Sequence, residues 1–195
     1  MASIALHSGR GHSIVAVALC GCELCHPAWA DDTLAGLPAL ERINITLNHR
    51  VVFADDASNW GRADHWATPD EFLARGAGDC EDFAIAKYFA LRAAGLPAAQ
   101  LRLAYTQLHA GGTGDVWRPH MVLAFLPADG TAAEALILDN VLDEIRPLSR
   151  RLDLRVLISF NADGIWRALE RGEPARPASR LAPWARMLQR MASPH

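Results

Sequence analysis

The strongest constraint on the fold is the stretch at residues 78–83, Gly-Asp-Cys-Glu-Asp-Phe, which leads into a helical pattern. After Cys80, apolar or small residues recur at the 3.6-residue spacing of one helix face, until Gly95 and Pro97 end the pattern. Asp79 stands where the residue that caps a helix N-terminus belongs. The sequence therefore predicts a helix that begins at Cys80, with the thiol in its first turn.

A thiol in the first turn of a helix lies close to free backbone N–H groups and to the positive end of the helix dipole. Both favour the thiolate, which is the nucleophilic form of cysteine. The neighbouring carboxylates of Asp79, Glu81 and Asp82 act in the opposite direction, because their negative charge favours the neutral thiol. A cation would neutralise them, and hard oxygen ligands of this kind suit Ca²⁺. The spacing is not that of an EF-hand loop, so the alternative, in which Asp79 caps the helix and Glu81 points to solvent, stays open.

The first 30 residues have the pattern of a secretory signal peptide. Arg10 precedes a short apolar run, and an Ala-Trp-Ala sequence at residues 28–30 has the form of a signal-peptidase site. A lipid-attachment box at residues 19–22, Leu-Cys-Gly-Cys, is the alternative. The signal-peptide interpretation divides the chain into a signal, a folded domain and a Pro/Ala/Arg-rich tail, at residues 1–30, 31–172 and 173–195.

Cys80 is the one cysteine of the chain after residue 30, because Cys20, Cys22 and Cys25 fall inside the predicted signal. A single cysteine in an oxidising compartment has no partner for an internal disulfide. It is then either a buried inert thiol or a reactive one. The polar neighbours of Cys80 favour the reactive thiol. The net charge of −3 gives no reason to expect nucleic-acid binding.

Helical patterns precede Cys80 and extended patterns follow its helix. Helices are expected at residues 34–52 and from the capping box at residues 68–71, with a polar loop at residues 55–66. Strands are expected at residues 101–106, 121–126, 135–138 and 154–160, with a closing helix or turn at residues 161–169. A length of 195 residues fits one domain with a single core. Because helical patterns come first and extended patterns follow within that domain, the predicted fold class is α+β.

Residues distant in sequence complete a candidate catalytic set. A thiol nucleophile needs a base that takes its proton and an acid that orients the base. His120 is the best-placed histidine because it leads directly into the strand expected at residues 121–126. If that strand folds back about Asp129 and Gly130, residues equidistant from the turn pair, and Asp139 lies directly opposite His120. The alternative for Asp139 is a residue that initiates a turn.

These motifs resemble those of the bacterial transglutaminase-like cysteine proteinases, specifically the LapG type. The resemblance runs from about Asn44 to Trp166 and rests mainly on residues 78–82, 120–123 and 138–140. It implies a papain/transglutaminase-like core, in which a Cys-bearing helix packs on an antiparallel sheet that carries His and Asp. It also implies Cys80 as nucleophile, His120 as base and Asp139 as its orienting acid, with Asp79, Glu81 and Asp82 as calcium-site candidates.

The resemblance further implies a location, a substrate and a partner. It indicates a calcium-dependent periplasmic endopeptidase that cleaves a large surface adhesin near its N-terminus and so releases a biofilm. It also indicates an inner-membrane cyclic di-GMP receptor that holds the enzyme inactive. Two other functions stay open: an acyltransferase such as a transglutaminase with the same triad, and a non-catalytic calcium-dependent binding module. Asn59 and Trp60 are candidate oxyanion donors.

Overall fold

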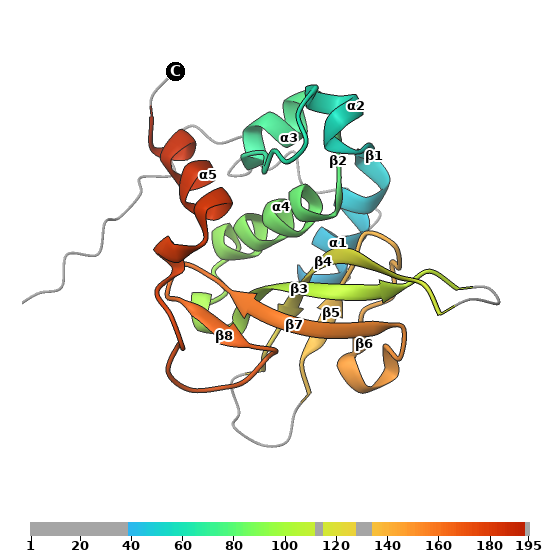
Figure 1. Ribbon diagram of the computed structural model, residues 1–195, viewed down its shortest axis with the longest axis vertical. Helices are drawn as coiled ribbons and strands as arrows, with labels where there is room; N and C mark the ends of the chain where they lie inside the picture. The colour runs from blue at the N-terminus through green and yellow to red at the C-terminus, as the bar shows by residue number, and fades with distance from the viewer. Residues whose placement is uncertain (1–38, 112–114, 128–133, 194–195) are drawn as a thin grey trace, which may run out of the picture.

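Helices gather on one face of an antiparallel sheet in the computed structural model, which describes residues 39–111, 115–127 and 134–193 (Figure 1). The signal peptide predicted for residues 1–30 and the turn predicted at Asp129 and Gly130 lie outside these residues. Within the described part of the chain, no helix is both long enough and apolar enough to cross a membrane.

The sheet has six strands in the order β6-β5-β4-β3-β7-β8, and each pairs antiparallel with its neighbours. Their bounds are β3 Leu101–His109, β4 Trp117–Phe125, β5 Leu136–Leu138, β6 Arg146–Pro147, β7 Leu154–Phe160 and β8 Ile165–Arg167. The four predicted strands are confirmed, although β3 and β4 continue further into the polar hairpin that joins them. The closing helix or turn at residues 161–169 is wrong, because Ile165–Arg167 forms a strand against the end of β7.

Five α-helices in the described ranges accompany the sheet: α1 Ala39–Arg50, α2 Asp56–Trp60, α3 Pro69–Arg75, α4 Cys80–Ala93 and α5 Ala182–Ala192. The predicted helices that begin after Thr68 and at Cys80 are confirmed, and Thr68 and Glu71 form the expected capping box. The loop predicted at residues 55–66 contains a helix, α2. This helix forms because the Asp55 carboxylate accepts a hydrogen bond from the Ser58 backbone N–H at 2.9 Å.

The long helix α4 is the centre of the core. It packs against β4, α1 and α3, which explains why apolar side chains occur all around it rather than on one stripe. The C-terminal stretch packs closely as well, since Trp184 of α5 is buried against Phe89 and Phe160. Trp66 stacks on Phe160 and is buried in the core.

A short parallel pair of strands, β1 (Val52–Phe53) and β2 (Ala77–Gly78), fixes the entrance to α4. Gly78 is required there by space. A Cβ atom at this position would lie 2.7 Å from Oδ2 of Asp82 and 2.7 Å from the ring of Phe72. The close approach holds the first turn of α4 against α3 and fixes the position of Cys80.

Candidate active site

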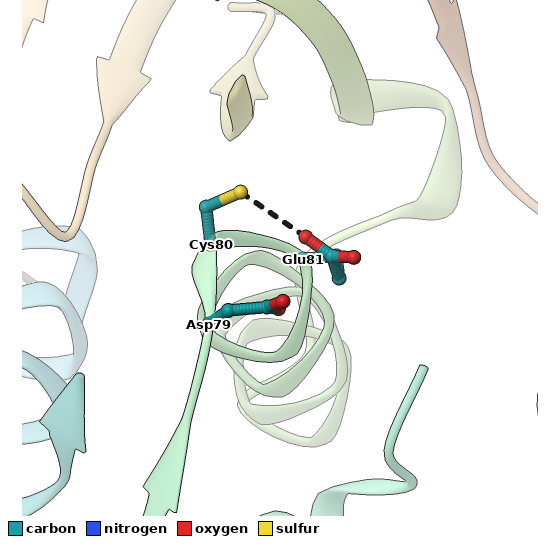
Figure 2. A group of neighbouring side chains, drawn as sticks. All are labelled: Asp79, Cys80 and Glu81. Atoms are coloured by element: carbon teal, nitrogen blue, oxygen red, sulfur yellow. Dashed lines mark hydrogen bonds between the residues drawn. The ribbon is translucent and has the colours of Figure 1, made fainter. Parts of the chain in front are cut away.

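The Cys80 thiol lies in the first turn of α4, as predicted, beside two carboxylates (Figure 2). Its Sγ donates a hydrogen bond to Oε2 of Glu81 at 3.1 Å. Burial raises the pKa of the Cys80 thiol, as do the negative charges of Glu81 and Asp79, while a hydrogen bond from the Met121 backbone N–H lowers it. With these carboxylates uncompensated, the thiol is protonated and a weak nucleophile.

The structure brings His120 and Asp139 together in a buried hydrogen bond. His120 Nε2 lies 2.8 Å from Asp139 Oδ1, and the two residues are 6% and 1% exposed. The predicted pairing was wrong by two residues, because Leu123 pairs with Leu138 and the register therefore does not set His120 opposite Asp139. The contact forms on the diagonal instead, between residues that lie on the same face of neighbouring strands.

Asp139 accepts hydrogen bonds from two groups in addition to its bond with His120. Its Oδ1 also accepts from the Val141 backbone N–H at 3.0 Å, and Arg151 Nη2 donates to its Oδ2 at 2.8 Å. The turn alternative for Asp139 is therefore compatible with its contact to His120. Burial alone would raise the pKa of Asp139, but the hydrogen bonds from His120, Val141 and Arg151 hold it well below its ordinary value. Asp139 is thus a carboxylate at neutral pH.

The helix of Cys80, α4, packs against β4, the strand that carries His120. The Met121 backbone N–H that bonds the Cys80 thiol belongs to the residue next to His120. In neutral His120, a proton on Nε2 donated to Asp139 leaves the lone pair on Nδ1. That nitrogen can take a proton from a thiol, as a general base does.

The acidic cluster is larger than the sequence predicted. Asp79, Glu81 and Asp82 are joined by Asp56 at the start of α2 and by the exposed Asp64. Candidate ligand atoms lie within 4.8 Å of one another in three groups: Asp79, Cys80 and Glu81; Asp56, Asp79 and Asp82; and Asp56, Asp64 and Glu81. Sequence reasoning missed Asp56 and Asp64 because their polar loop lies far from Cys80 along the chain. The one signal was an acidic loop that precedes the motif.

Two buried carboxylate oxygens in this cluster lack a hydrogen-bond partner among the described residues. Within the described chain, Oδ1 of Asp56 and Oδ1 of Asp79 are buried without a hydrogen bond. Asp82 is different, since its two oxygens accept from the backbone N–H groups of Ala67 at 2.7 Å and Asp79 at 3.4 Å. Asp82 therefore has a structural role at the helix start in addition to any role in metal binding.

Burial shifts the carboxyl groups of this cluster toward their neutral forms. Burial, followed by the charge of Glu81, raises the pKa of Asp79 far above its ordinary value. Burial raises the pKa of Asp82 to about 7, and it also raises the pKa of Asp56. Buried oxygens without partners are costly unless a proton or metal ion satisfies them. The cluster therefore fits a hard cation that takes several oxygen ligands, such as Ca²⁺.

The two oxyanion candidates have different environments. The Asn59 side chain makes structural hydrogen bonds: its Nδ2 donates to the Ala77 carbonyl at 2.9 Å, and its Oδ1 accepts from Arg75 Nε at 2.9 Å. The Trp60 ring packs on His65 with 4.5 Å between centroids, and its Nε1 is buried without a partner among the described residues. Asn59 is thus better explained as a support for β2 than as an oxyanion donor.

Comparison with known proteins gives a consistent set of matches. Residues 16–171 match the model of a family described as bacterial transglutaminase-like cysteine proteinase BTLCP. Three solved structures of LapG from Legionella pneumophila are similar. The EGTA-treated form is 37% identical, with a TM-score of 0.69, and the match covers 84% of this chain and 86% of that chain. The calcium-bound form is 38% identical, with a TM-score of 0.68 and coverage of 84% and 87%. A third LapG structure is 37% identical, with a TM-score of 0.67 and coverage of 84% and 86%. No curated protein matches the chain.

Proposed function

The chain belongs to the bacterial transglutaminase-like cysteine proteinases, and from this we propose that it is a calcium-dependent periplasmic endopeptidase that cleaves a surface adhesin. Family membership makes the chain a cysteine protease and confirms the predicted fold class. The observation that carries the proposal is the buried hydrogen bond between His120 and Asp139. His120 belongs to β4, the strand that packs against the helix of Cys80.

In this proposal Cys80 is the nucleophile, His120 the general base and Asp139 the group that orients His120. His120 takes the thiol proton, and the Cys80 sulfur attacks the carbonyl carbon of the scissile peptide bond. The C–N bond then breaks, and the leaving amine takes the proton from His120, which leaves a thioester on Cys80. Water, deprotonated by His120, hydrolyses that thioester and restores the thiol.

We propose Asp56, Asp79, Glu81 and Asp82 as the residues that hold Ca²⁺, with Asp64 at the margin. The unpartnered oxygens of Asp56 and Asp79 support this, as does the similar LapG structure that is calcium-bound. A bound Ca²⁺ would supply positive charge that compensates the carboxylates around Cys80. Glu81 would then coordinate the metal ion, and the helix dipole would favour the Cys80 thiolate.

The proposed substrate is a large surface adhesin, cleaved near its N-terminus to release a biofilm. The proposed inhibitory partner is an inner-membrane receptor for cyclic di-GMP. Both come from the resemblance to LapG-type enzymes. The periplasmic location is supported by the signal-peptide pattern of residues 1–30, which predicts a mature chain that begins at Asp31. N-terminal sequencing of the exported protein tests this, and a functional form that retains Met1 would contradict export.

The test of this function is digestion of the N-terminal part of a candidate adhesin by the mature protein in Ca²⁺. We expect a single cut, with two fragments whose masses add up to the substrate plus one water. Cross-linked or amine-modified products would instead support the acyltransferase alternative, because transfer differs from hydrolysis only in the acceptor. Calcium-dependent binding without either product would support the non-catalytic binding module.

A further inference from the structure

Arg151, which follows the turn η5 (Leu148–Arg150), is a buried cation on the far side of Asp139 from His120. It is 3% exposed, and its Nη2 lies 2.8 Å from Asp139 Oδ2 and 2.8 Å from Asp153 Oδ2. Its Nε also contacts both Asp153 oxygens, at 2.9 and 3.3 Å. The Arg151 backbone is fixed as well, because its N–H donates to the Leu148 carbonyl and its carbonyl accepts from the Leu154 N–H.

The two oxygens of Asp139 are therefore committed to different donors. Oδ1 accepts from His120 and from the Val141 backbone N–H, whereas Oδ2 accepts from Arg151. Contacts on both oxygens fix the plane of the carboxylate as well as its position. In this arrangement Asp139 cannot rotate away from His120 Nε2 without losing the contact with Arg151.

Among the described residues, Asp139 also interacts electrostatically with Lys87 on α4 and with Asp153 on a loop, and Lys87 in turn with Asp143. Lys87 is 1% exposed and feels the charges of Asp139 and Asp143, while burial lowers its pKa to about 7. The positive charge of Lys87 therefore changes within the neutral pH range. Arginine stays charged throughout that range, so Arg151 provides a constant charge beside Asp139.

We propose that Arg151 is a positioning residue for the catalytic pair. It keeps the buried Asp139 ionised and turned toward His120, so that His120 retains the proton on Nε2 and acts as a base through Nδ1. This inference rests on the proposed function, because it assigns Arg151 a part in the action of the triad. A purely structural role is the alternative, in which Arg151 joins the η5 turn to Asp153 and contributes only to stability.

The test compares Arg151→Gln, Arg151→Lys and the control Asp153→Asn, using two readouts. One is kcat for cleavage of the adhesin fragment in Ca²⁺. The other is the downfield proton resonance of the imidazole N–H of His120, identified by its loss in His120→Gln. This resonance reports the bond to Asp139 and needs no substrate. Thermal melting of each variant separates loss of function from loss of fold.

We expect Arg151→Gln to lower kcat by about 10- to 100-fold, by analogy with the loss seen when partners that orient metal-ligating side chains are removed. As the pH is lowered, its His120 resonance should disappear at a higher pH than in the wild type. The reason is that Asp139 loses a partner that lowers its pKa, so its carboxylate is protonated earlier. Arg151→Lys keeps the charge and should retain the resonance with an intermediate kcat. Asp153→Asn leaves the contact to Asp139 and should resemble the wild type in both readouts.

Two results would overturn the proposal. One is an Arg151→Gln protein that keeps both the resonance and wild-type kcat. The other is an Asp153→Asn protein whose kcat and His120 resonance fall as much as those of Arg151→Gln. The role of Arg151 would then be to join the η5 turn to Asp153. If Arg151→Gln does not fold, loss of the resonance in folded Arg151→Lys, despite its charge, would also contradict it. If the wild type cleaves no adhesin while the resonance depends on Arg151 as expected, the positioning role stands and the proposed substrate fails.

Discussion

Replacement of Cys80 by alanine is expected to abolish cleavage, with a loss of about 10⁴-fold or more, and to leave the fold intact. Alanine preserves helix propensity in the first turn of α4, and the thiol is only half-buried. Activity is measured by cleavage of the adhesin fragment, and folding by circular dichroism and thermal melting. Turnover at the wild-type rate by the Cys80→Ala protein would contradict a thiol mechanism.

The same loss is expected for His120→Ala, because the members of a triad act as a unit. Asp139→Asn should be equally severe or milder, since the amide keeps the volume but removes the charge that orients His120. His109→Ala is the matched control. His109 packs on Trp117, at the end of the hairpin, and has no contact with the triad in the described structure. If His109→Ala and His120→Ala reduce activity equally, His120 has no special role.

Removal of calcium is the second change with a large expected effect. Chelation with EGTA should abolish cleavage, and added Ca²⁺ should restore it. Mg²⁺ should restore it poorly, because it requires a tighter octahedral geometry. The physical reason is the cluster of carboxylates around Cys80, which holds the thiol neutral unless a cation compensates their charge. Full activity after exhaustive chelation would show that these carboxylates have only a structural role at the start of α4.

Calcium should also stabilise the fold, with a dependence on pH. At 100 times its dissociation constant, a ligand of the native state adds about 2.7 kcal/mol, or about 5–10 °C in melting temperature for a domain of this size. Because burial raises the pKa values of Asp56, Asp79 and Asp82, the metal-free fold should lose stability as pH rises from the ordinary carboxyl range through about 7 for Asp82 and about 9 for Asp79. Ca²⁺ replaces those protons, so its stabilising effect should increase over the same range.

Variants of the cluster separate metal binding from other causes. Glu81→Ala should remove both the calcium-dependent activity and the calcium-dependent rise in melting temperature, although Cys80 is still present. Asp56→Asn tests the proposed ligand that the sequence did not identify. Glu144→Gln is the control, because Glu144 is an exposed carboxylate paired with Arg146 outside the cluster. A calcium shift that is equal in Glu81→Ala and Glu144→Gln would contradict the proposed site.

Local chemistry made some features predictable from the sequence. The helix start at Cys80 and the capping box of Thr68 depend on neighbouring residues alone, and both are confirmed. The contact between His120 and Asp139 was also predictable, since two strands joined by one turn bring their same-face residues together. The register was not, because the sequence does not fix the length of the connection between the two strands, and an error of two residues preserves the face.

Features that depend on the tertiary fold were not predictable. Asp56 joins the acidic cluster only because β1 and β2 pair and bring the start of α2 beside the start of α4. Arg151 contacts Asp139 because η5 and β7 return the chain to the end of β5. Neither residue belongs to a local motif. Trp184 likewise becomes a core residue through contacts with Phe89 and Phe160, which lie far from it in sequence.

The most direct test of the central claim, that His120 and Ca²⁺ together activate Cys80, is the rate of alkylation of Cys80 by iodoacetamide at neutral pH. Cys80 is the sole cysteine after residue 30, so the intact mass of the mature protein reports this one thiol. We expect alkylation of the wild type in Ca²⁺ to be at least about tenfold faster than in EGTA, and faster than His120→Ala in Ca²⁺, since each unit in pKa changes the thiolate population about tenfold. Equal rates in all three samples would contradict the account.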